Sequence, residues 1–128
     1  MERNREQREI PVYWAALFVA VTANITANVA LKISILSVEG TTPLETLAKV
    51  AVRPTFWLGI LAAGILLGSF VFALRQIELS TAYIFVSVSA IVGISIVSVL
   101  LLGETMGVYK FLGILLAIAG LALILKSA

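Results

Sequence analysis

The stretch from Ser80 to Leu102, STAYIFVSVSAIVGISIVSVLLL, decides the class of fold, because it carries no charged residue. An α-helix of this length crosses the ~30 Å hydrocarbon core of a lipid bilayer. A lone strand could not cross it, since its backbone groups would stay unpaired in lipid. Three further apolar runs have the same character. Together they predict four membrane-spanning helices at about 11–36, 55–75, 80–102 and 108–125.

The composition of the 128-residue chain agrees with a membrane protein. It is 61% hydrophobic and 12% charged, whereas an average soluble domain is about 25% charged. Disorder is excluded as well, because it requires low hydrophobicity. Six charges crowd into the first nine residues, namely Glu2, Arg3, Arg5, Glu6, Arg8 and Glu9. We therefore expect a charged cytoplasmic tail at 1–10 and a transmembrane domain at 11–128.

Missing residue types exclude several kinds of chemistry. The chain has no Cys and no His, which removes thiol catalysis, disulfides and the commonest metal ligand and general base. The net charge of +2 is small, and no basic patch with interleaved aromatic residues indicates nucleic-acid binding. We expect no enzymatic activity, no cofactor, no metal ion and no nucleic-acid partner.

The connections between the spans predict the fold class. Residues 76–79 and 103–107 are short links, which make consecutive helices antiparallel neighbours. The longer first link contains an amphipathic segment at about 43–52, which we expect to lie at the membrane surface. The expected fold class is all-α, an integral membrane bundle of four transmembrane helices.

The distribution of basic residues gives a small positive-inside bias. We expect both chain ends to be cytoplasmic. This orientation places five basic residues inside (Arg3, Arg5, Arg8, Arg75 and Lys126) and three outside (Lys49, Arg53 and Lys110).

A polar stripe in the first span is the most informative functional signal. Asn24, Asn28 and Lys32 follow one another at intervals of four residues, so a helix presents them on one face. Polar stripes inside a span usually face protein or a wet cavity. Two interpretations stay open. The stripe lines a translocation pathway, or Lys32 extends to the interface while the amides link neighbouring helices.

The third span offers weaker candidates. Tyr83 and Ser87 are four residues apart, and the Tyr83 hydroxyl is expected near a cavity mouth at the interface. Most of the other small hydroxyl residues are explained by close helix packing. Glu104, in the turn after this span, is expected to be a solvated anchor. No acidic residue lies in the middle of any span, although a proton-coupled or cation-coupled carrier usually keeps one there.

Small-residue ridges predict helix contacts beyond a single chain. The second span contains Gly64 and Gly68, and the fourth contains Gly113, Ala117 and Gly120. Such ridges let helices approach closely. Four helices enclose little space, and transporters commonly bind their substrate between two repeats. We therefore expect a homodimer, with a heterodimer as the alternative.

The last hairpin of the sequence resembles that of a known superfamily. Leu102–Thr105 gives a Gly-Glu turn, and Leu112–Gly120 gives a glycine-rich final helix. On this basis the chain is identified as a four-helix, EamA-like member of the drug/metabolite transporter superfamily. Its size is similar to that of the small multidrug resistance proteins and of the aminoarabinose-lipid flippase subunits. The resemblance implies a bacterial inner membrane location.

Individual positions separate these two relatives. The multidrug exporters carry a Glu eight residues before a Lys that ends the first helix, and the corresponding residue before Lys32 is Asn24. They also have a Trp three residues after a Tyr, and Val86 stands at that distance from Tyr83. The flippase subunits have an amide, typically Gln, four residues before the Lys, and Asn28 is similar to it. The resemblance therefore favours lipid transport.

The resulting functional expectation is translocation of a polyprenyl-phosphate-linked sugar or another anionic lipid. Lys32 would meet the phosphate, and Asn24 and Asn28 would bind sugar or phosphate oxygens. The expected substrate-binding residues are Asn24, Asn28, Lys32, Tyr83 and Ser87. The alternatives are export of a small molecule or cation, and an accessory subunit of a heterodimeric transporter.

Overall fold

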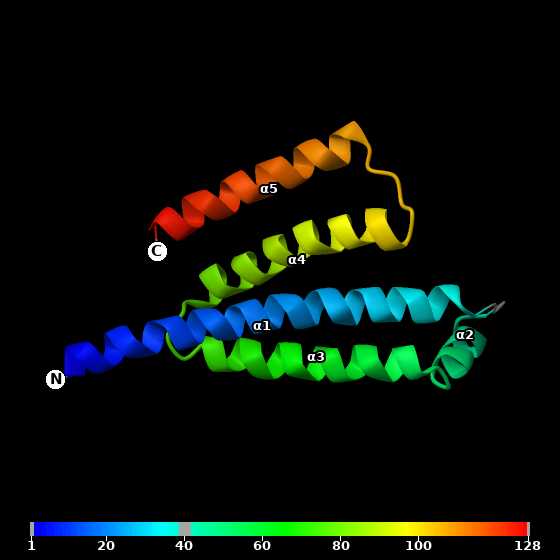
Figure 1. Ribbon diagram of the computed structural model, residues 1–128, viewed down its shortest axis with the longest axis horizontal. Coiled ribbons are helices and arrows are strands. Elements are labelled where there is room, and N and C mark those ends of the chain that lie inside the picture. The colour runs from blue at the N-terminus through cyan, green and yellow to red at the C-terminus, as the bar shows by residue number, and fades with distance from the viewer. Residues whose placement is uncertain (1, 39–41, 128) are drawn as a thin grey trace.

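Five helices make up the computed structural model, which describes residues 2–38 and 42–127, with their side chains from residue 11 onward (Figure 1). Four of the helices are long and apolar enough to cross a membrane, and Pro11–Leu36 is the apolar part of the first. The expectation of an all-helical chain is confirmed. In chain order the helices are α1 (Glu2–Leu36), α2 (Pro43–Val50), α3 (Pro54–Ala73), α4 (Leu79–Leu101) and α5 (Val108–Ser127).

The start of α1 differs from the expected one. The sequence predicts a helix that opens at Pro11, but α1 begins at Glu2 and contains Pro11. A proline inside a helix loses one backbone hydrogen bond and crowds the carbonyl four residues before it, but the Glu, Arg and Gln residues before Pro11 are good helix formers. The charged residues at 2–9 therefore belong to the same helix as the first span.

The short helix α2 is bounded by identifiable residues. Thr42 is its N-cap, with the Thr42 hydroxyl accepting a hydrogen bond from the Glu45 backbone N–H at 3.2 Å. Pro54 disfavours helical geometry at Arg53, which is extended. The helix accordingly ends at Val50, before the expected residue 52. Its apolar side chains Leu44 and Leu47 are exposed, as expected for a helix at a membrane surface.

The long helices are arranged around α1. The Tyr13 ring stacks on Phe72 near the end of α3, and Ser34 bonds Thr55 near its start, so α1 and α3 are antiparallel. Helix α4 runs parallel to α1 on its other side, and α5 returns along α4 (Figure 1). The short 76–79 and 103–107 links give the antiparallel pairs that the sequence predicts.

The buried core lies at one end of this arrangement. It joins Leu17 and Val21 of α1 to Ala73 of α3 and to Ala82 and Val86 of α4. The Trp14 and Phe18 rings both contact the Phe85 ring edge-on, with centroids 5.4 and 5.6 Å apart. These aromatic contacts, which are favourable beyond the area they bury, fix the first half of α4 on α1.

Two glycines permit the closest helix contacts. A Cβ atom added at Gly59 of α3 would lie 3.0 Å from Leu31 Cγ on α1. A Cβ atom added at Gly93 of α4 would collide with Ile25 Cδ1 and lie 3.1 Å from Ile25 Cγ1. Glycine at both positions therefore lets the Leu31 and Ile25 side chains pack directly on the neighbouring helix.

The four long helices lie side by side in the order α3, α1, α4 and α5 (Figure 1). Helix α5 packs chiefly on α4 and has no buried residue among those described. Cβ atoms added at Gly64, Gly68, Gly113 or Gly120 would meet nothing within 4 Å. The small-residue ridges are thus not used for packing within the chain, because α1 alone occupies the centre.

Replacing Thr55 by Val is expected to destabilise the α1–α3 contact modestly. The Ser34 and Thr55 hydroxyls share a 2.6 Å hydrogen bond, and Ser34 is fully buried. Loss of one such bond costs about 0.5–1.5 kcal/mol. Unfolding of the purified protein by titration with a denaturing detergent measures this cost. Thr26→Val is the matched control, because the Thr26 hydroxyl bonds only its own helix, at Thr22 O. Equal losses in both variants would contradict a role for the inter-helix bond.

Candidate functional site

The polar stripe of α1 continues the face that forms the buried core. Leu17, Val21, Asn24, Asn28 and Lys32 follow at intervals of three or four residues, which places them on one helix face. Leu17 and Val21 are buried, Asn24 is half-buried, and Asn28 and Lys32 are exposed. The stripe therefore leaves the core and opens toward the C-terminal end of α1.

The two asparagines are coupled to each other. Asn28 Nδ2 donates hydrogen bonds to Asn24 O at 2.8 Å and to Asn24 Oδ1 at 2.6 Å. Within the described part of the chain, Asn24 Nδ2 and Asn28 Oδ1 have no protein partner. A donor and an acceptor thus remain, which is the combination that sugar hydroxyls or a protonated phosphate can bind.

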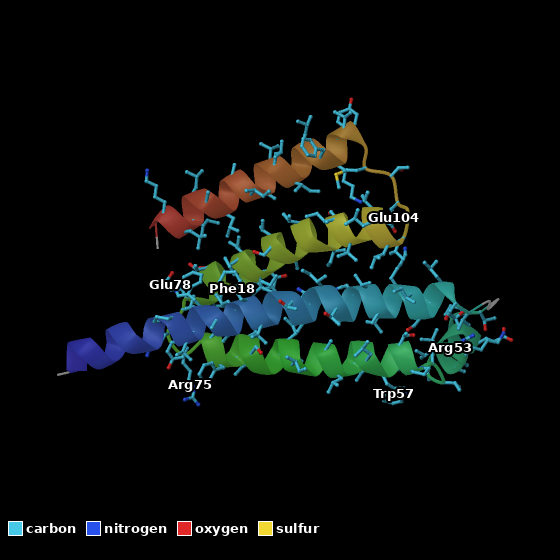
Figure 2. All side chains as sticks on the ribbon, in the orientation of Figure 1. Phe18, Arg53, Trp57, Arg75, Glu78 and Glu104 are labelled. Atoms are coloured by element: carbon cyan, nitrogen blue, oxygen red, sulfur yellow. The ribbon has the colours of Figure 1, made fainter. Side chains whose placement is uncertain are left out.

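Lys32 meets the carboxylate of Glu104. Lys32 Nζ lies 3.6 Å from Glu104 Oε1, and the two side chains are 50% and 38% exposed. Figure 2 shows Glu104 in the turn after α4, at the end of the molecule that also holds Arg53 and opposite the end that holds Arg75 and Glu78. Glu104 is therefore a partner of the stripe, and the expectation of a merely solvated anchor is wrong.

The order of the spans along the chain could have predicted that Lys32 and Glu104 lie at the same end of the molecule. One span lies between the first and the third. The first and third spans therefore cross the bilayer in the same direction. Lys32 near the end of the first span and Glu104 just after the third then lie at the same membrane surface. The sequence does not reveal that these two helices are direct neighbours.

Tyr83 and Ser87 are not brought to the stripe. Both lie near the beginning of α4, at the level where Phe85 contacts Trp14 and Phe18. Tyr83 is 63% exposed. Because α4 is parallel to α1, Asn28 and Lys32 lie at the opposite end of this contact, where Lys32 reaches Glu104. The structure thus brings together Asn24, Asn28, Lys32 and Glu104.

A separate apolar groove runs along the other side of α1. A cavity of about 430 Å³ lies between α1 and α3, and one of about 310 Å³ also touches α4 at Val97. Both are lined by Thr26 and Leu58. The Thr22 and Thr26 hydroxyls donate to Phe18 O and Thr22 O at 3.0 and 2.9 Å. The hydroxyl groups are satisfied locally, which leaves the groove apolar.

The described residues include no cluster of three or more His, Cys, Asp or Glu side chains that could hold a metal ion. No protein-family model, curated protein or solved structure matches the chain. The function must therefore be argued from the residues and their geometry.

Proposed function

We propose that the protein is a membrane transporter that translocates a polyprenyl-phosphate-linked sugar or another anionic lipid. The observation that carries this proposal is a solvent-accessible lysine at the end of an amide stripe within a candidate membrane span. Lys32 lies four residues before the end of its span, where its side chain reaches the membrane surface and can meet the head group of a lipid. An ammonium group is a compact positive charge that suits a phosphate.

The dimensions of the stripe suit a phosphorylated head group. Asn24 and Lys32 are separated by eight residues, and therefore by about 12 Å along the helix axis. In this proposal Lys32 binds the phosphate, while Asn24 Nδ2 and Asn28 Oδ1 bind hydroxyl groups next to it. The apolar groove on the other side of α1 keeps the protein surface compatible with lipid chains during translocation.

A second copy of the chain completes the pathway in this proposal. The stripe lies on an open face, and the ridges at Gly64 and Gly113 have no neighbour within 4 Å. A homodimer formed through these ridges would supply the missing wall. We place it in the bacterial inner membrane with both chain ends inside, as the resemblance to the drug/metabolite transporter superfamily and the basic residues favour.

Replacing Gly113 by Leu is expected to weaken the dimer at least fivefold in dissociation constant, because a bulky side chain separates the two helices. Sedimentation or native mass spectrometry in mild detergent measures the association. Ile118→Leu on the same helix is the control, since it keeps the volume and adds no bulk to the ridge. A variant that dimerises like the original chain would refute this interface. A strictly monomeric chain that captures another four-helix protein would favour the heterodimer.

The lipid that copurifies with the protein tests the proposed substrate class. We expect mass spectrometry of the protein, purified in mild detergent, to show enrichment of a phosphate-bearing anionic lipid over its share in the membrane extract. Lipids present only in their bulk proportions would contradict the proposal.

Glu104 favours a second candidate function, export of a small cation. It supplies a partly exposed carboxylate next to the stripe, and carboxylates bind cations. Cells that express the protein would then survive higher concentrations of toxic quaternary ammonium compounds, and Glu104→Gln would abolish this resistance. Anionic-lipid transport predicts no such resistance.

A further inference from the structure

The contact between α1 and α4 differs sharply at its two ends. At one end, aromatic rings and the buried core hold the helices together. Beyond Gly93, the buried residues of α4 are the small Ser95 and Ser98, and Val97 lines the 310 Å³ cavity. The end of α4 that carries the 102–107 turn therefore lacks the aromatic rings and larger core side chains that hold its other end.

The Lys32–Glu104 ion pair ties this end of α4 to α1. Among the residues that the structure describes, no other ion pair or side-chain hydrogen bond joins α1 to the 102–107 turn. Exposed pairs of this kind are weak, typically below about 1 kcal/mol, so the tie is easily broken. A ligand that bears a phosphate can compete with the carboxylate for the same ammonium group.

Glu104 is also coupled to α4 through its backbone. Gly103 has φ = 65°, a left-handed conformation that suits glycine and reverses the chain at the end of α4. The Glu104 N–H then donates to Ser98 O at 3.1 Å. The Glu104 side chain is therefore attached closely to the last turn of α4, and through α4 to α5, which packs chiefly on α4.

We propose that the Lys32–Glu104 pair is a latch, and that an anionic lipid head group opens it by replacing Glu104 on Lys32. The end of α4 with the 102–107 turn then moves away from α1, while the aromatic contacts around Phe85 act as the hinge. The latch itself follows from the contacts described above. Its opening by an anionic lipid rests on the proposed function.

A spin label at position 105 tests the latch. The chain has no Cys, so Thr105→Cys gives one labelling site, at an exposed residue beside Glu104. In nanodiscs of phosphatidylcholine, Glu104→Gln is expected to raise the mobile fraction of the label about two- to fivefold, the range that an exposed ion pair sustains. The reversed pair Lys32→Glu with Glu104→Lys is expected to restore the original mobility. Glu78→Gln, at the opposite end of α4, is the matched control and should change nothing.

The second part of the experiment adds phosphatidic acid to the same nanodiscs. We expect it to raise the mobile fraction of the otherwise unaltered labelled protein, and to have no further effect on Glu104→Gln, in which the ion pair is already broken. A label that is unmoved by Glu104→Gln would overturn the latch. Mobility that responds to Glu104→Gln but not to phosphatidic acid would overturn the displacement. Neither result decides lipid translocation, which is measured separately, so failure of the latch and failure of the transport function are distinguishable.

Discussion

Lys32→Ala is expected to reduce translocation of an anionic lipid head group by the purified protein in liposomes at least tenfold. Hydrogen bonds to charged groups contribute about 1.5–3 kcal/mol, and each 1.4 kcal/mol is a factor of ten in affinity. The alanine variant removes the only positive charge on the stripe from Leu17 to Lys32. It leaves the Asn24–Asn28 hydrogen bonds in place, so the amides alone would have to hold the phosphate.

Two variants make this result specific. Lys32→Arg keeps the charge and is expected to retain a substantial part of the activity, although its planar donor group differs in shape from an ammonium. Lys110→Ala removes an exposed lysine at the start of α5, which has no role in the proposal, and should transport normally. Translocation by Lys32→Ala at the original rate would show that the lysine is not the phosphate ligand.

Gly93→Leu is expected to lower the stability of the folded chain by about 1–3 kcal/mol or more, the usual cost of overpacking a well-packed contact. A Cβ atom at this position collides with Ile25 Cδ1, at the end of that side chain. Ile25 can turn away from a Cβ atom alone, but the further atoms of leucine must also find room between α1 and α4. Titration with a denaturing detergent measures the change.

Gly113→Leu is the control for this variant, because a Cβ atom there meets nothing within 4 Å of the same chain. Under conditions in which the protein is monomeric, this control should unfold like the original protein. A Gly93→Leu variant that is as stable as Gly113→Leu would contradict the observed spacing between α1 and α4.

Most of the helices could be predicted because proline or glycine residues mark several of their ends. Pro43 and Pro54 begin α2 and α3, and the Gly103 turn follows α4. The start of α1 was missed because proline is most favourable at the first position of a helix, whereas Pro11 lies inside α1. The sequence did not predict which helices are neighbours. Helices α3, α4 and α5 have no distinct polar face, so their sequences do not show which side of each helix packs on another.

The candidate site was predictable only where polar residues stand out in an apolar helix. Asn24, Asn28 and Lys32 share a face because their spacing matches the helix repeat. Tyr83 and Ser87 share a face of α4 for the same reason, but their spacing does not say where along α1 that face lies. Glu104 was missed because its partner is distant in sequence and depends on the packing of α4 against α1.

The central claim is that this chain moves an anionic lipid head group across a bilayer through the Lys32 stripe. Protein-dependent translocation of a labelled polyprenyl phosphate in liposomes of phosphatidylcholine tests it most directly. We expect translocation above that of protein-free liposomes. A polyprenol that lacks the phosphate is expected neither to compete with the labelled lipid nor to be translocated itself. Equal rates with and without the protein would contradict it.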